Sequence, residues 1–292
     1  MFKKGVYAAT ISIINKDYSL NVEETVKHAV GLIKNGLHGV FFFGSTGQSQ
    51  LISSDEKKVL ISKIASHKMR KNFFLGTGSN SLKENLDLIK YGLEFDFNTF
   101  LIMPPAYYKS NSDTGVYNFY DAIISKNPKV KIILYNFEKL SGYKFNKEIV
   151  KKLKSDFPKN IIGCKDSSYN LFQDLKLEDF LIFPGSEAKL LKGLELGCAG
   201  CISAVTNVTH SISRKVFDDF KNDQKQEKNK LLIQVRELFD KYHLISAVHS
   251  YLGVENNLYN NLLPPLELLK ENDLKNLLKE LDNLKFGIKI AA

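Results

Sequence analysis

Several apolar runs in this sequence end in side chains that can carry out covalent or proton-transfer chemistry. Lys165 follows Ile-Ile-Gly-Cys, Tyr135 follows Ile-Ile-Leu, and Ser45 and Thr46 lie in a loop that glycines flank. Burial disfavours the charged form of a lysine at the tip of an apolar run, which leaves part of it as a free amine that can attack a ketone. The residue types therefore suggest a Schiff-base lysine.

The hydroxyl groups could support that reaction. The phenol of Tyr135 can shuttle a proton if another hydroxyl connects it to solvent. The loop around Ser45 and Thr46 offers backbone N–H groups and two hydroxyls, which suit a carboxylate. Each feature also has an ordinary explanation: an ion pair of Lys165 with Asp166, a core tyrosine, and a simple turn. Their convergence on several strand ends favours the chemical interpretation.

Secondary-structure elements must bring these side chains together, and the sequence predicts a repeated strand–helix unit. Short β-branched or aromatic runs alternate with longer amphipathic stretches, which is typical of βα units and a parallel sheet. The predicted strands are Val6–Ile14, Gly39–Gly44, Asn72–Gly76, Thr99–Met103, Lys131–Asn136, Ile161–Lys165, Phe180–Pro184 and Cys201–Ala204. The predicted helices, several with Ser or Asn caps, include Val22–Asn35, Asp55–His67, Leu82–Leu93, Lys147–Ser155, Gln226–Tyr242 and Leu266–Lys285.

Eight such strands without a linker predict an α/β fold, a (β/α)8 TIM barrel with additional C-terminal helices. Residues 1–210 would form the barrel core, and residues 211–292 the last barrel helix and a helical extension of the same domain. A doubly wound open sheet is the alternative, but no Gly-x-Gly-x-x-Gly turn opens a helix. Because the carboxyl ends of barrel strands share one rim, Lys165, Tyr135 and Ser45 are expected to meet there.

Composition argues against several classes of protein. The formal charge is 41 − 32 = +9, but the lysines are interspersed with acids and no basic-aromatic run or finger spacing occurs. We therefore expect no nucleic-acid partner. No apolar run approaches the roughly 20 residues of a membrane span, so no membrane partner is expected either. Three cysteines are too few for a disulfide scaffold and indicate a reducing, cytoplasmic location.

The sequence also predicts no metal and no cofactor. The histidines never take His-x-His or His-x-x-x-His spacing, and no P-loop glycine motif is present. Cys198 and Cys201 have Cys-x-x-Cys spacing, but they lie in a Gly/Ala-rich segment and Cys164 is the only other thiol. A packing role is predicted for these cysteines.

In chain order, the strand ends resemble the dihydrodipicolinate synthase / N-acetylneuraminate lyase family. The matching motifs cover nearly the whole chain and are Gly44-Ser45-Thr46-Gly47, Pro105-Ala106-Tyr107, Tyr135-Asn136, Lys165-Asp166-Ser167, Gly185-Ser186-Glu187 and Gly200-Cys201-Ile202-Ser203 with Asn207. Each motif alone is weak, and together they are highly specific. The resemblance implies a pyruvate-dependent carbon–carbon lyase, a metal-independent class I aldolase that forms a Schiff base and uses pyruvate and an aldehyde.

The resemblance also implies roles for individual residues. Lys165 would condense with the keto group, Tyr135 would be the proton shuttle, and Ser45 would be the relay hydroxyl. Tyr107 would complete the relay across a subunit interface, so the site implies an oligomer, typically a homotetramer built as a dimer of dimers. The substrate-binding residues implied in the same way are Thr46 and the backbone including Gly47 at the carboxylate, and Gly185, Glu187 and Ile202 along the pocket.

Departures from the family pattern concern the second substrate. Dihydrodipicolinate synthases carry an arginine five residues after the shuttle tyrosine, where this chain has Leu140. Leucine cannot bind a carboxylate as the fork of an arginine does, although adjacent Lys139 is a candidate replacement. The run Leu140-Ser141-Gly142 is more similar to neuraminate lyases and sugar-acid aldolases, and this resemblance places Leu140 and Ser141 among the substrate-binding residues. The expected substrate is therefore a 2-oxo-3-deoxy sugar acid or a related hydroxylated 2-oxo acid.

Two alternatives stay open. Gly78-Ser79-Asn80 and Ile202-Ser203 are more similar to synthases, so the 4-hydroxy-tetrahydrodipicolinate synthase of lysine biosynthesis is the second hypothesis. A barrel that binds a 2-oxo acid without turnover is the third, because folds host many functions.

Overall fold

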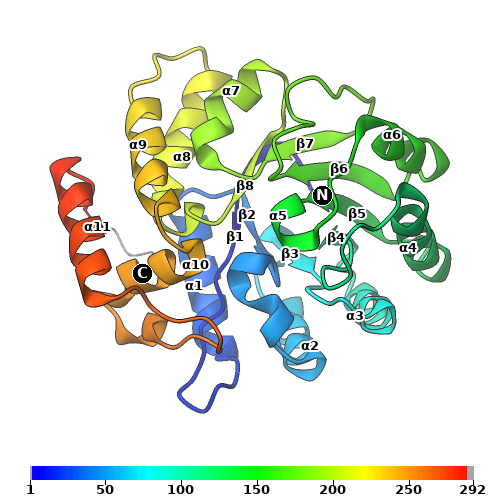
Figure 1. The fold of residues 1–292 in the computed structure, drawn as a ribbon, viewed down its shortest axis with the longest axis horizontal. Coiled ribbons are helices and arrows are strands. Elements are labelled where there is room, and N and C mark those ends of the chain that lie inside the picture. The colour runs from blue at the N-terminus through cyan, green and yellow to red at the C-terminus, as the bar shows by residue number, and fades with distance from the viewer. Residues whose placement is uncertain (1, 288–292) are drawn as a thin grey trace.

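Eight parallel strands form a nearly closed barrel in the computed structural model, which describes residues 2–287 (Figure 1). The strands are β1 (Gly5–Ala9), β2 (Gly39–Phe42), β3 (Phe73–Gly76), β4 (Thr99–Ile102), β5 (Lys131–Asn136), β6 (Ile161–Asp166), β7 (Leu181–Pro184) and β8 (Gly200–Ser203). Consecutive strands from β1 to β7 pair in parallel, and β8 pairs with β1. The predicted (β/α)8 TIM barrel is confirmed.

Helices separate and cover the strands. They are α1 (Val22–Lys34), α2 (Ser54–Ala65), α3 (Leu82–Glu94), α4 (Asp113–Lys126), α5 (Glu138–Ser141), α6 (Lys147–Asp156), α7 (Leu190–Glu195) and α8 (Thr206–Lys221), followed by α9 (Asn229–Asp240), α10 (Leu244–Gly253) and α11 (Glu271–Asn283). The caps are as predicted: the side chains of Asn21, Ser53, Ser81 and Asn146 each accept a hydrogen bond from the first turn of the helix that follows.

The predicted ends of several elements were wrong. The first strand ends at Ala9 instead of Ile14, because the Asn207 side chain replaces a neighbouring strand beyond that point: it donates to the Ala9 carbonyl (2.9 Å) and accepts from the Ile11 N–H (3.2 Å). The helices expected over 226–242 and 266–285 are α9 and α11, both shorter at each end. Met1 and residues 288–292, which the predicted domain ranges include, lie outside the described residues.

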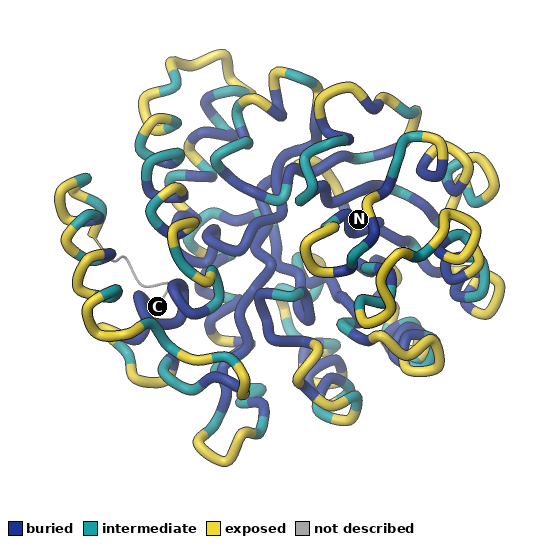
Figure 2. The backbone as a smooth tube through the Cα atoms, in the orientation of Figure 1, coloured by how far each residue is buried: buried dark blue, intermediate teal, exposed yellow. Residues whose placement is uncertain are grey.

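Aromatic and aliphatic side chains fill the interior of the barrel. They come from alternate strand positions and include Tyr7, Phe41, Phe74, Leu101, Ile133, Phe183 and Ile202. Phe2 closes the amino-terminal end, with its ring centroid 5.0 Å from those of Tyr7 and Phe74. Figure 2 shows the buried strands at the centre and the exposed outer surfaces of the helices. The interior is therefore packed, and a ligand site must lie at one of its two ends.

The C-terminal helices α9 and α10 pack against α8, and α11 packs against α9 and α10 (Figure 1). They share a core with Ile11 and Ile13 from the segment that leaves β1. A buried hydrogen-bond chain adds to this contact: Tyr259 Oη lies 3.0 Å from His28 Nδ1, and His28 Nε2 lies 2.9 Å from Asn207 Oδ1. Because that amide oxygen can only accept, His28 carries its proton on Nε2 and Tyr259 donates. The shared core and the hydrogen-bond chain join the C-terminal helices to the barrel.

Among the described residues, no helix has the length and apolar character that crossing a membrane requires. The same part of the chain holds no group of three or more His, Cys, Asp or Glu side chains arranged to bind a metal ion.

A polar contact closes the barrel between β7 and β8. These two strands stand at the ends of the hydrogen-bonded strand order, and a backbone bond from Ala199 N to Ile182 O (2.8 Å) crosses between their segments. At the carboxyl end, the Ser203 hydroxyl donates to the Glu187 carboxylate. Arg236 of α9 donates to both, with Nη1 2.9 Å from Glu187 Oε2 and 2.9 Å from Ser203 Oγ. We call Glu187, Ser203 and Arg236 the seam clasp.

We expect the free energy of unfolding to decrease as the pH falls from about 6.5 toward 4. Burial lowers the pKa values of His28 and His249 from 6.5 to about 4. Between these values the unfolded chain binds protons that the folded chain does not, so the stabilisation is complete above the unfolded pKa and is lost as pH falls toward the folded one. The loss is up to about 3 kcal/mol for each histidine.

Urea unfolding at about pH 7 and about pH 5 measures this effect. His28→Gln removes one titrating group and should show a weaker pH dependence than the wild type. His243→Gln, at an exposed position, is the matched control and should keep the wild-type dependence. An unchanged dependence in His28→Gln would contradict the assignment.

A second prediction concerns the seam clasp. Arg236→Met leaves the fully buried Glu187 carboxylate without its cation, so the free energy of unfolding should decrease by about 3–5 kcal/mol. The double variant Glu187→Met/Arg236→Met removes both charges and should recover most of that loss. Arg214→Met, which breaks the partly exposed pair with Asp218, is the control and should cost less than about 1 kcal/mol. Equal losses for Arg236→Met and Arg214→Met would show that the clasp does not stabilise the barrel.

Candidate active site

The loop after β2 positions Ser45 at the carboxyl rim. A short 3₁₀ turn covers Ser45–Gly47 and ends at Gln48, which takes a left-handed conformation (φ +55°). The Gln48 side chain accepts the N–H of Leu263 at 2.8 Å, which ties the loop to the C-terminal segment. A Cβ at Gly47 would lie 2.9 Å from the Thr10 carbonyl oxygen, so the close approach of this loop to the β1 segment requires glycine.

Tyr135 and Lys165 lie side by side inside the same rim. They are register partners on the paired strands β5 and β6, and both side chains are almost fully buried (4% and 3% exposed). The Lys165 Nζ lies 4.2 Å from the centroid of the Tyr135 ring. The register of the two parallel strands places these residues side by side, so the amine of Lys165 lies next to the ring of Tyr135.

A hydrogen bond joins the two parts of the site. Ser45 Oγ lies 3.1 Å from Tyr135 Oη, across ninety residues of sequence. The amine, the phenol and the serine hydroxyl therefore form one continuous group, and Ser45 is its least buried member. The structure brings together the three residues that the sequence singled out for chemistry.

The alternative explanation for Lys165, an ion pair with Asp166, is wrong. The Asp166 carboxylate accepts hydrogen bonds from the N–H groups of Tyr169, Leu171 and Phe172 and from the Asn136 amide, all between 2.8 and 2.9 Å. It shapes the loop after β6 and is saturated. In the described part of the chain, no carboxylate lies within the 4.0 Å that defines an ion pair with Lys165.

The residues expected along the pocket have different surroundings. Ile202 is fully buried in the barrel interior, and Thr46 is buried beside Ser45. A Cβ at Gly185 would lie 1.9 Å from Ser167 Oγ, so glycine permits close contact of the β6 and β7 loops. Glu187 points into the seam clasp, where its other oxygen accepts from Thr209 (3.2 Å). Both oxygens of its carboxylate therefore accept hydrogen bonds from side chains of β8, α8 and α9.

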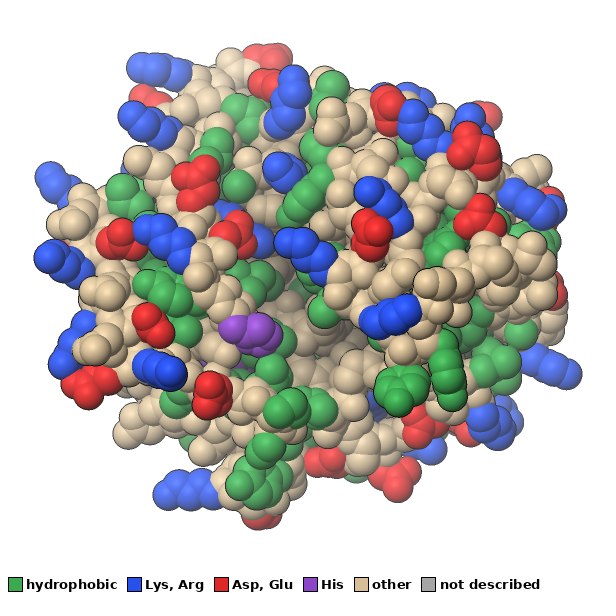
Figure 3. Space-filling view, in the orientation of Figure 1, with side chains coloured by type: hydrophobic (Ala, Val, Ile, Leu, Met, Phe, Trp, Pro, Cys, Tyr) green, Lys and Arg blue, Asp and Glu red, His purple; other side chains and the backbone are tan. Residues whose placement is uncertain are grey.

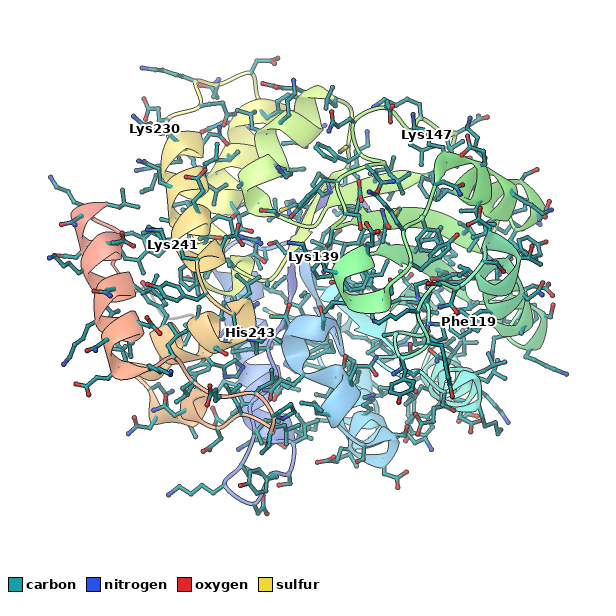
Figure 4. All side chains as sticks on the ribbon, viewed as in Figure 1. Phe119, Lys139, Lys147, Lys230, Lys241 and His243 are labelled. Carbon is teal, nitrogen blue, oxygen red and sulfur yellow. The ribbon has the colours of Figure 1, made fainter. Side chains whose placement is uncertain are left out.

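Helix α5 lies over the mouth of the barrel in Figure 1. Leu140 is 38% exposed, and its carbonyl accepts from the Lys109 ammonium (3.1 Å). The Ser141 hydroxyl is bonded to the backbone of Phe137 and Tyr143, so it stabilises the turn of α5. Figure 3 shows a hollow at the centre of this face, and Figure 4 places Lys139 and His243 at its border.

Tyr107 is not joined to the other site residues within one chain. Its side chain is 78% exposed and packs edge-on against Tyr108, itself 75% exposed, with ring centroids 5.2 Å apart. Two large aromatic side chains exposed together are typical of a surface that another molecule covers.

Two buried cations were missed by the sequence analysis. Arg236 has no distinctive signal, because with Asp240 it has the i, i+4 spacing of an ordinary surface pair. Burial works against its charge, but the Glu187 and Asp240 carboxylates raise the pKa of Arg236 above its usual range. Lys57 did have a signal, since it shares the apolar face of α2 with Leu60 and Ile64. Burial lowers the pKa of Lys57 to about 8.

The three cysteines are free and buried. Burial raises the pKa of Cys198 to about 11 and those of Cys164 and Cys201 well above the usual value, which disfavours their reactive thiolate forms. These surroundings agree with the predicted packing role.

Known proteins resemble this chain over most of its length. A 2-dehydro-3-deoxy-D-gluconate/2-dehydro-3-deoxy-phosphogluconate aldolase from Picrophilus torridus is 30% identical over 236 residues, 78% of this chain and 86% of the relative. A 4-hydroxy-tetrahydrodipicolinate synthase from Pelagibacter ubique is 31% identical over 260 residues, 87% and 85% of the two chains. The crystal structure of dihydrodipicolinate synthase from Agrobacterium tumefaciens superposes with a TM-score of 0.87 at 25% identity and covers 97% of this chain and 99% of that one.

The sequence profile of the Dihydrodipicolinate synthetase family matches residues 2–283. With the barrel and the convergence of lysine, tyrosine and serine at its carboxyl rim, this match shows that the chain belongs to that family and is a class I lyase, a Schiff-base aldolase or synthase.

Proposed function

We propose that the protein is a pyruvate aldolase in which Lys165 forms the Schiff base. The observation that carries this proposal is the contact of Lys165 with Tyr135 and of Tyr135 with Ser45, in a site where no carboxylate among the described residues holds the ammonium. The lysine nitrogen attacks C2 of the 2-oxo acid, and the carbonyl oxygen leaves as water with protons that reach it through Tyr135 and Ser45.

Cleavage then uses the protonated imine as an electron sink. Tyr135 takes the proton of the C4 hydroxyl, the C3–C4 bond breaks, and its electron pair moves toward the imine nitrogen, which forms an enamine and releases the aldehyde. The enamine takes up a proton at C3, and water hydrolyses the imine to pyruvate and free Lys165. In this proposal Thr46 and the backbone at Gly47 hold the pyruvyl carboxylate, while Gly185 and Ile202 form the pocket wall.

The proposed substrate is a 2-oxo-3-deoxy sugar acid or a related hydroxylated 2-oxo acid. Leu140 at the border of the mouth supports this choice, since it offers no bidentate partner for a carboxylate on the aldehyde. The likeness to the aldolase from Picrophilus torridus points in the same direction. Three buried, free thiols support a reducing, cytoplasmic location.

Borohydride trapping tests the role of Lys165. Treatment with pyruvate and borohydride should add one reduced pyruvyl group, and peptide mapping should place it on Lys165. Lys165→Met should lose the adduct and at least about 10⁴-fold of turnover. Lys57→Met, which removes the other buried lysine near the carboxyl rim, is the control and should keep the adduct. An adduct on Lys57, or one that survives in Lys165→Met, would refute the proposal.

The second candidate function is the 4-hydroxy-tetrahydrodipicolinate synthase, which the likeness to the Pelagibacter ubique enzyme favours. We expect pyruvate to be consumed with polyhydroxylated aldehydes and not measurably with aspartate semialdehyde. A coupled assay with both kinds of aldehyde decides between the two functions. Rapid turnover of aspartate semialdehyde that Lys139→Met abolishes would establish the synthase, with Lys139 in place of the missing arginine.

We also propose a homotetramer, a dimer of dimers in which Tyr107 reaches the relay of a second copy. Its exposure beside Tyr108 supports such a contact. Sedimentation equilibrium should then give about four times the 33.1 kDa chain mass. Tyr107→Phe should keep this mass and lower kcat by about 10²-fold or more, the range expected for a proton-transfer group, whereas Tyr108→Phe should leave kcat unchanged. A monomer with full activity would overturn the proposal.

A further inference from the structure

We propose that the amino-terminal end of the barrel holds a second ligand site, which binds an organic anion with a flat apolar body. A cavity of about 930 Å³ opens there, on the side opposite the Lys165 rim. The first residues of four strands line it: Phe73, Thr99, Lys131 and Leu181. This volume lies in the range of small-molecule sites, which is about 300–1,000 Å³.

The floor of the cavity is apolar and separates the cavity from the barrel interior. It consists of Phe2 and Phe74, whose rings meet edge-on with centroids 5.0 Å apart, together with the half-buried side chains of Ile162 and Leu181. Phe97 adds an aromatic wall. Phe2 and Phe74 each keep 8% of their surface exposed, and aromatic surface suits a planar apolar group better than a strongly hydrated one. Because Phe2 seals the packed interior, a ligand here does not reach Lys165.

The charges around this floor are mainly positive. Lys131 lies on the interior side of β5, two positions before Ile133, and is half-buried in the cavity wall. Lys68 and Lys71 also line the cavity, and within residues 2–287 none of these three lysines forms an ion pair or a hydrogen bond through its ammonium. A half-buried ammonium without a partner favours an anion beside it.

The remaining charged groups do not supply that anion. Asp96 is bound by Arg70 at 3.1 Å, and the Arg70 guanidinium lies 5.4 Å from the centroid of the Phe97 ring. Asp179 lines the cavity but is exposed, and it lies beyond ion-pair distance of every described lysine and arginine. The cavity lining therefore contains four cationic side chains (Lys68, Arg70, Lys71 and Lys131) and two carboxylates. One of these carboxylates, Asp96, is already paired with Arg70. A ligand with a carboxylate or phosphate on a flat ring would pack its ring on the apolar floor and place its negative charge beside the lysines.

Three probes separate these two requirements. 1-Naphthoate carries a ring and a carboxylate, 1-naphthalenemethanol carries the ring without the charge, and acetate carries the charge without the ring. Calorimetric titration should show binding of naphthoate at least about tenfold tighter than of either other probe. Pyruvate should not compete, because its proposed site is at the opposite rim. Equal affinities for the naphthoate and the alcohol, or competition by pyruvate, would overturn the proposal.

Variants then locate the site. Lys131→Met should weaken naphthoate binding about tenfold or more, and Lys71→Met, at an exposed position that cannot disturb the core, should weaken it severalfold. Lys90→Met on α3 removes an exposed lysine outside the cavity and should have no effect. Turnover at the Lys165 rim, whatever its substrate, should be unchanged in all three variants. Unaltered naphthoate binding in both Lys131→Met and Lys71→Met would show that the probe binds elsewhere.

Discussion

A barrel of parallel strands functions only if the ring closes, because closure places every strand end on one rim. In this protein the ladder runs from β7 through β1 to β8, and the remaining gap is bridged by few backbone bonds. The seam clasp closes that gap at the end where Lys165 and Tyr135 lie. Glu187 follows β7, Ser203 ends β8, and Arg236 binds both from outside. Because the Arg236–Glu187 ion pair is buried, removal of either partner leaves an uncompensated charge in the interior and destabilises the fold.

This arrangement connects the C-terminal extension to the site. Arg236 belongs to α9, and Gln48 beside Ser45 is bonded to the backbone of Leu263, so two separate parts of the extension hold two parts of the rim. The extension therefore positions elements of the barrel in addition to covering it. At the clasp, the Glu187 carboxylate accepts hydrogen bonds from the side chains of Ser203, Thr209 and Arg236.

The fold and the three central residues could be predicted because they depend on local patterns. The βα alternation gives the barrel, and a barrel brings strand ends together without further information. What could not be predicted depends on contacts distant in sequence. The early end of β1 results from Asn207, almost two hundred residues away, and the burial of Arg236 results from a carboxylate 49 residues earlier. In the sequence alone, Arg236 is indistinguishable from the surface cations around it.

The two buried lysines near the carboxyl rim show why burial alone does not identify a nucleophile. Lys57 is as buried as Lys165 (2% and 3% exposed), but its ammonium donates to the carbonyls of Thr77 and Gly78, both at 3.0 Å. Those donated bonds hold the Lys57 nitrogen against the backbone of the loop that follows β3. Lys165 instead faces the ring of Tyr135, whose hydroxyl is bonded to Ser45. A buried lysine becomes a candidate nucleophile when its neighbours can move protons and leave its nitrogen free, and this contrast in partners is what selects Lys165.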